Sequence, residues 1–211
     1  MSHRSEPQLL VLHAVRLLGF AGEDAVARRA GVGAEETLVR LHQAERSSWV
    51  QHLELFGVNG WSLTDFGRWE NERQLAHERR IADPGNEIAA IYREFLPLNA
   101  RMLSATTDWQ IRPRPDDAFA SNDHSDTDWD ARVLDEVEAL GVELAPVVER
   151  LTNILTRFEG ILNRYEAALS RAEDGQTEWI DRTDVDSCHL VWFQLHEDLI
   201  ATLGIDRGTE V

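Results

Sequence analysis

The sequence predicts a mainly α-helical fold in two parts, and three observations support this. Apolar residues recur at helical spacing along most of the 211 residues. A strand pattern occurs only between residues 49 and 63. Acidic charge is concentrated in the second part: residues 1–70 carry seven arginines and nine acidic residues, whereas residues 71–211 carry fourteen and 29. We expect an N-terminal domain over residues 1–70, a linker helix over 71–85 and an acidic helical domain over 86–208.

The composition indicates the cellular compartment of the protein and excludes some kinds of metal or disulfide site. A chain of this length with 43% hydrophobic residues can bury a core. It contains no run of about 18 apolar residues and its start lacks the apolar segment of a signal peptide, so we expect a cytoplasmic protein with no membrane partner. Cys188 is the single cysteine, which excludes an internal disulfide and any zinc site with two thiolates.

Three short helices are predicted first. Residues 8–18 have apolar positions at helical spacing and end before Gly19, and residues 22–32 form a second helix that ends at Gly31. A third helix runs over residues 34–47. Its predicted inward side chains are Ala34, Leu38 and Leu41, and its predicted outward ones are Glu36, Arg40, Gln43 and Ser47. Short helices joined by glycine turns are typical of a helix-turn-helix.

A β-hairpin is predicted after the third helix. Residues 49–56 form a strand-like run, Asn59 and Gly60 suit a tight turn, and residues 61–63 return as a second strand. A hairpin in this position is the wing of a winged helix. Thr64 then provides the N-cap of a helix that continues to Ile81.

The first third of the chain, residues 8 to about 80, resembles the MarR-type and PadR-type winged-helix transcriptional regulators. The recognition helix has the form GVG-x-x-x-T-x-x-x-L, and the segment after the wing matches LT-x-x-GR. The matching residues of that segment are Leu63, Thr64, Gly67 and Arg68. The resemblance implies an N-terminal winged helix-turn-helix with a small β-hairpin wing, followed here by an all-helical C-terminal bundle.

Binding to double-stranded DNA is the expected role of the N-terminal domain. The wing has no arginine, so contacts depend on the helices, and Arg40 and Gln43 are the side chains best placed to read base edges. The predicted DNA-binding residues are Arg28, Arg29, Glu36, Thr37, Arg40, Gln43 and Arg46. We expect a homodimer, because two weak half-site contacts then combine, with residues 65–81 and the helix after them in its interface and the C-terminal domain taking part in dimerisation. A winged helix that contacts protein instead of DNA is the alternative.

The C-terminal domain is predicted to be a bundle of four or five helices. The apolar patterns cover residues 86–107, with a kink at Pro97, then 129–140, 144–165 and 187–203. The loop over residues 112–130 is rich in aspartate, but Ala131 and Val137 occupy positions where a calcium loop needs glycine and glutamate. We therefore expect a solvated loop whose Asp126 or Asp128 caps the next helix.

The last helix raises the question of a binding site. A helical wheel places His189 and His196 within the apolar arc around Trp192, whereas Gln194, Glu197 and Asp198 are expected to face water. Two interpretations stay open: core histidines with buried partners, or histidines that line a small-molecule pocket. The predicted ligand-binding residues are Trp109, His124, Trp129, His189, Trp192 and His196.

The sequence as a whole predicts a transcriptional regulator that binds DNA and senses a small-molecule effector. No cofactor, metal or enzymatic activity is predicted, since no catalytic pair of residues stands out. The alternatives are a winged-helix interaction adaptor and a metal-dependent enzyme with His124, His189 and His196 as ligands. The spacing of seven residues between the last two disfavours a shared metal on one helix.

Overall fold

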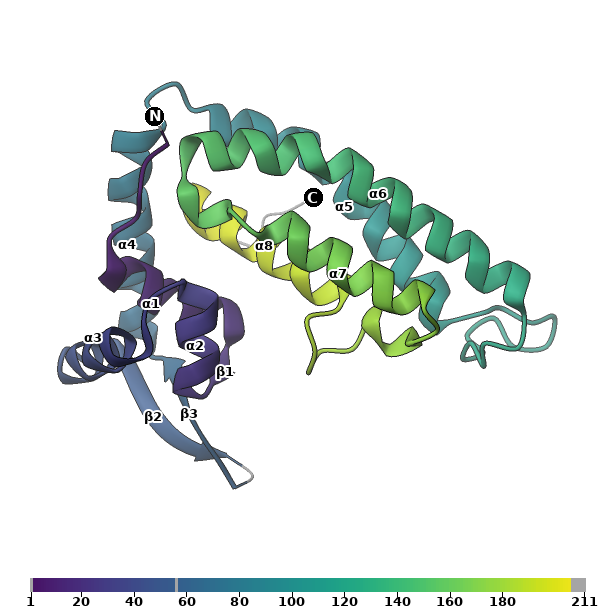
Figure 1. Cartoon of the computed structure of the whole chain (residues 1–211), viewed down its shortest axis with the longest axis horizontal. Coiled ribbons are helices and arrows are strands. Elements are labelled where there is room, and N and C mark those ends of the chain that lie inside the picture. The colour runs from purple at the N-terminus through teal and green to yellow at the C-terminus, as the bar shows by residue number, and fades with distance from the viewer. Residues whose placement is uncertain (1, 56, 206–211) are drawn as a thin grey trace. The chain divides into compact units, whose positions relative to one another are not determined.

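A computed structural model describes residues 2–55 and 57–205 of the protein. Over these residues the fold is mainly helical, with one three-stranded antiparallel sheet (Figure 1). Contacts divide the chain into two compact units. The first unit comprises the described residues of 1–87, 153–157 and 197–211, and the second comprises 88–152 and 158–196. The predicted linker helix thus belongs wholly to the first unit, which also takes two short segments from the predicted C-terminal domain.

The elements of the first unit follow the predicted order closely. They are α1 (Pro7–Leu18), β1 (Phe20–Ala21), α2 (Glu23–Ala30), α3 (Ala34–Arg46), β2 (Val50–Leu55), β3 (Val58–Leu63) and α4 (Asp65–Ala82). Gly19 and Gly31 follow α1 and α2 with positive φ, as expected for glycines that end helices. The Thr64 hydroxyl accepts a hydrogen bond from the Gly67 backbone N–H at 2.9 Å, which confirms the predicted N-cap of α4.

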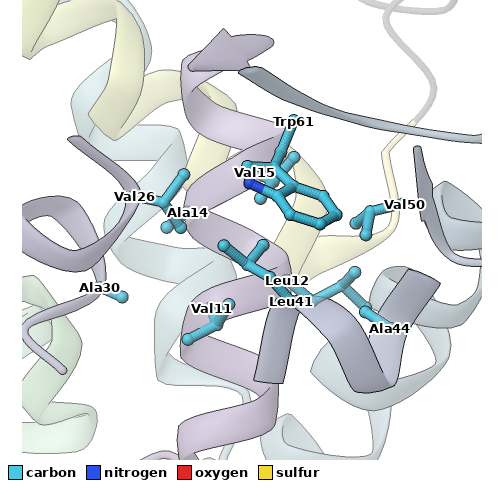
Figure 2. Packing of buried hydrophobic residues seen from close by; sticks show 10 residues of the cluster. All are labelled: Val11, Leu12, Ala14, Val15, Val26, Ala30, Leu41, Ala44, Val50 and Trp61. Carbon is cyan, nitrogen blue, oxygen red and sulfur yellow. The ribbon is translucent and has the colours of Figure 1, made fainter. Parts of the chain in front are cut away.

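The core of the first unit combines α1, α2 and α3 with the sheet. Figure 2 shows the side chains from these elements that meet in one cluster. Its buried members are Val11, Leu12, Ala14, Val15, Val26, Ala30, Leu41, Ala44, Val50 and Trp61. Because α1 contributes four of them, it is the central helix of this cluster.

The prediction of the hairpin turn was wrong. β2 and β3 pair from Val50↔Leu63 to Leu55↔Val58, so the turn lies between Leu55 and Val58, where Gly57 has φ +79°. Gly60 instead lies inside β3, opposite Leu53. A Cβ at residue 60 would come within 2.6 Å of the Phe20 ring, so the glycine makes room for packing. Phe20 belongs to β1, a two-residue strand that the sequence did not predict.

The second unit is helical in its described residues. Its elements are α5 (Glu87–Gln110), most of α6 (Thr127–Ile154), α7 (Ile161–Glu173), η2 (Thr177–Trp179) and the first half of α8 (Cys188–Leu203). The short η1 (Thr156–Phe158) begins in the first unit and ends in the second. Pro97 lies inside α5 without ending it, as expected. None of the helices described is both long and apolar enough to cross a membrane.

The prediction of separate helices over residues 129–140 and 144–165 was wrong. A single helix, α6, runs through Gly141 and Pro146 to Ile154, and α7 begins only after Gly160, which has φ +80°. A Cβ at residue 141 would lie 2.8 Å from the Tyr165 ring, so this glycine serves close packing between α6 and α7. The cost of about 1 kcal/mol for a glycine inside a helix is thereby offset by tertiary contact.

Candidate functional site

The exposed face of α3 carries the polar group that the sequence predicted. The Arg40 guanidinium donates to Glu36 Oε1 at 3.1 Å and to Gln43 Oε1 at 3.4 Å. All three side chains come from successive turns of one helix and reach solvent. This cluster places a guanidinium and an amide side by side, which is the chemistry that reads base edges in a major groove.

The predicted inward face of α3 was partly wrong, and so was one predicted contact residue. Thr37, Leu41 and Ala44 are the buried side chains of this helix, whereas Ala34 is exposed. Thr37 is fully buried, and its hydroxyl donates to the Val32 carbonyl at 3.3 Å. It therefore cannot contact DNA in this conformation. The rotation of the buried face by one residue explains the error, because Thr37, Leu41 and Ala44 also keep helical spacing.

The three other predicted arginines differ in exposure. Arg28 and Arg46 are exposed, and in the described part of the chain neither has a carboxylate within 4 Å. The Arg29 guanidinium instead turns inward, and its Nε and Nη2 are inaccessible to solvent. Of the predicted arginines, Arg28, Arg40 and Arg46 therefore reach solvent, whereas two guanidinium nitrogens of Arg29 do not.

Large apolar side chains are also exposed on α3, on the hairpin and on α4. Val39 on α3, Leu55 at the end of β2 and Val58 at the start of β3 are all at least 43% exposed. On α4, Phe66 and Trp69 are also exposed, and their rings stack on each other with centroids 5.8 Å apart. Exposed apolar groups of this kind are common in surfaces that contact other proteins.

The predicted ligand-binding residues do not form one pocket. The Trp109 and His124 rings pack at 4.7 Å, and His124 Nδ1 lies 2.9 Å from Asp130 Oδ2. Trp129 donates its indole N–H to the Asp108 carbonyl at 2.7 Å. These contacts join the end of α5 to the start of α6 and the loop between them. They give His124 Nδ1 and the Trp129 indole N–H local partners.

The histidines of α8 lie in two different environments in the second unit. His196 packs against the rings of Tyr92 and Phe95, and Trp192 donates to Asn99 Oδ1 at 3.0 Å. Burial lowers the pKa of His189, against an opposing effect of Asp181. Both histidines are half-buried. Among the residues described, no group of three or more histidine, cysteine and acidic side chains is arranged to hold a metal ion.

The expected solvent-facing side of α8 was wrong. Gln194, Glu197 and Asp198 are 2%, 8% and 1% exposed, so α8 is buried around most of its circumference. Each has an arginine partner from a distant segment: Arg164 for Gln194 at 2.8 Å, Arg16 for Glu197 at 2.9 Å, and Arg157 for Asp198 at 3.3 Å. Arginine partners compensate the cost of removing these polar groups from water.

A buried ionic cluster in the first unit is the feature that the sequence analysis missed. Arg157 pairs with Glu78 and Asp198, and its Nη2 donates to Thr202 Oγ1 at 2.6 Å. His13 lies between Asn71 and Asp198, with its two ring nitrogens 3.2 Å from an oxygen of each. The charged side chains of this cluster are at most 5% exposed.

The cluster sets the protonation state of Asp198. Burial by itself raises the pKa of this carboxyl, but its interactions with Arg157, then with His13 and Arg29, outweigh burial and hold the pKa well below its usual range. Asp198 is therefore an anion at any ordinary pH. The signals in the sequence were a histidine within the apolar pattern of α1 and two adjacent acids within that of α8.

A pocket of about 280 Å³ lies in the second unit, between α5 and α6. It is lined by Arg101, Ser104, Ala105, Asp108, Trp129, Arg132, Val133 and Glu136. Trp129 is the one residue of the predicted ligand-binding set that lines it. The α5 residues are spaced by three or four positions, as are the α6 residues, so one face of each helix forms a wall.

Comparisons of the chain with protein-family models, with curated proteins and with solved structures find no match.

Proposed function

We propose that the protein is a DNA-binding transcriptional regulator whose first unit is a winged helix and whose second unit senses a small effector. The order α1, β1, α2, α3, β2, β3 in the first unit supports a winged helix, and α3 is then the helix proposed for recognition. The observation that carries the proposal is the half-exposed Arg40 and Gln43 pair on α3. The pocket between α5 and α6 supports the sensing role.

The effector acts by a difference in affinity between two conformations of the protein, because a ligand that binds both equally shifts nothing. A homodimer fits this function, since two α3 helices then bind two half-sites. The stacked Phe66 and Trp69 on α4 support a dimer interface on that helix.

Arg40→Ala tests the DNA-binding proposal. Purified protein is incubated with sheared genomic DNA of its source organism, and bound fragments are recovered and sequenced. Affinity for the most enriched fragment is then measured by fluorescence anisotropy. Loss of one base-reading side chain is expected to cost about 1–3 kcal/mol, or roughly tenfold to a hundredfold in affinity.

Arg80→Ala is the matched control, because Arg80 also lies in the first unit and also contacts a neighbour on its own helix, His77 at 3.4 Å, but is not on α3. We expect it to bind the fragment as the parent does. Failure to enrich any fragment, or equal binding by Arg40→Ala and the parent, would contradict the proposal.

A protein-interaction adaptor is the second candidate function. The observation in its favour is the exposed apolar group of Val39, Leu55 and Val58 on α3 and the hairpin. A wing without arginine also lacks the cations that usually lie against phosphates. The selection experiment distinguishes the two functions, because an adaptor enriches no DNA fragment.

A further inference from the structure

The pocket between α5 and α6 contains two opposite charges that do not pair with each other. Asp108 and Arg132 both line it, yet they form no ion pair within 4 Å, and neither pairs with any other charged group in the described part of the chain. Asp108 is half-buried at the end of α5. An acidic and a basic residue that line the same small cavity without an ion pair between them suit a ligand that carries both charges.

Arg132 is held in a position to bind a carboxylate. Its Nε donates to the Asp128 carbonyl at 3.2 Å, and its guanidinium lies 5.0 Å above the Trp129 ring. These two contacts orient the guanidinium and leave its terminal N–H groups for a ligand. Two parallel N–H groups match the two oxygens of a carboxylate.

The second arginine of the pocket is already neutralised. Arg101 donates to Glu136 and to Glu143, each at 2.7 Å, and these carboxylates raise the pKa of its guanidinium further above its ordinary value. The pocket therefore offers a single available cation, which disfavours a phosphate or a dicarboxylate. Its net charge, with Asp108 and Glu136 opposite the two arginines, is zero.

The rest of the pocket is small and apolar. Ala105 and Val133 line it and are buried, and Trp129 lines it with its indole N–H already bonded to a backbone carbonyl. The volume of about 280 Å³ is close to the lower end of the roughly 300–1,000 Å³ found for small-molecule pockets, so the ligand is small.

We propose that this pocket binds a free neutral α-amino acid, with the carboxylate on Arg132, the ammonium group on Asp108 and the side chain against Trp129. The inference deepens the sensing role and rests on the proposed function for its biological meaning. Binding itself is measured without DNA. If no amino acid binds, the Arg40→Ala test of DNA binding is therefore unaffected. If DNA binding fails, the measurement of amino-acid binding is unaffected in turn.

The experiment screens the neutral L-α-amino acids one at a time at millimolar concentration, by thermal shift and then by calorimetry. We expect at least one to raise the midpoint of unfolding and to bind saturably. For that amino acid, the analogue without the amino group and the amine without the carboxylate should each bind about tenfold more weakly or worse, since each loses one charged hydrogen bond.

Two variants and one control assign the charges. Arg132→Gln and Asp108→Asn should each weaken binding about tenfold or more. Arg93→Gln is the matched control, because Arg93 is also exposed and its Nε also donates to the carbonyl four residues earlier at 3.2 Å, but it does not line the pocket. The proposal is overturned if no amino acid binds, if the analogue without the amino group binds equally, or if Arg93→Gln loses as much affinity.

Discussion

The first unit buries five carboxylates and one histidine among its described residues. In the described residues of the second unit, by contrast, every charged side chain stays in contact with solvent. The buried set of the first unit is His13, Glu70, Glu78, Asp83, Glu197 and Asp198. The buried polar groups of the second unit are neutral: Thr106, Asn122, Ser187 and Gln194.

This difference shows that two mainly helical units of one chain are stabilised differently. A buried charge needs a partner of opposite sign, so the first unit depends on pairs such as Arg157 with Asp198. The second unit depends on apolar packing around residues such as Phe95, Tyr165 and Trp192, with neutral hydrogen bonds at its edges. Changes to single polar groups should therefore have larger effects in the first unit.

The largest effect is expected from Asp198→Ala. The substitution removes the carboxylate that Arg157 and His13 contact, and both of these side chains stay buried. Breaking a buried pair in this way lowers the free energy of unfolding by about 3–5 kcal/mol. Urea unfolding followed by circular dichroism measures this loss. Asp198→Asn keeps the volume and should still lose most of the stability.

Asp135→Ala is the control for that change, because Asp135 is exposed on α6. Its unfolding free energy should stay within about 0.5 kcal/mol of the parent value. If Asp198→Ala were equally mild, the buried cluster would not stabilise the first unit and the comparison would fail.

A smaller effect is expected from Tyr165→Phe in the second unit. The Tyr165 hydroxyl is buried and donates to the Val137 carbonyl at 2.7 Å, and burial raises the pKa of the phenol well above its usual range. Loss of this neutral hydrogen bond should cost about 1 kcal/mol in the same urea experiment. A loss as large as that of Asp198→Ala would show that the second unit also depends on single polar contacts.

The smallest effect is a difference in pH dependence between the units. Burial lowers the pKa of His189 on folding. The contribution of this residue to the unfolding free energy is therefore present above about pH 6.5 and is lost as the pH falls through the lowered pKa. The pKa of Asp198 is also lowered, so its contribution to the unfolding free energy is present above about pH 3.9 and is lost only in stronger acid.

Thermal unfolding across this pH range checks both windows. Between pH 6.5 and mildly acidic pH, the His189→Gln variant should lose less stability than the parent protein. The difference in stability between Asp198→Asn and the parent protein should be largest above pH 4. A His189→Gln variant with an unchanged pH profile would contradict the buried environment of that histidine.

The sequence predicted well those features that local signals control. The spacing of apolar residues and the glycines that end helices predicted the bounds of α1, α2 and α3 to within one or two residues. The N-cap at Thr64 predicted the start of α4. It failed at Gly60 and Gly141, which look like a turn and a helix break but serve packing against Phe20 and Tyr165. A glycine required for space and one required for positive φ look the same in the sequence.

For the candidate sites, the sequence by itself determined the residue types on α3 and the spacing that brings Arg40 and Gln43 together, because both lie on one helix. It did not determine which side of α8 is buried, since the partners of its polar residues lie far away, 181 positions in the case of Arg16 and Glu197. The pocket between α5 and α6 likewise combines side chains of two helices. Helical periodicity identifies neighbours within one helix, whereas the partner of a buried charge and the shape of a cavity arise only when distant segments pack together, and that was decided by the tertiary structure.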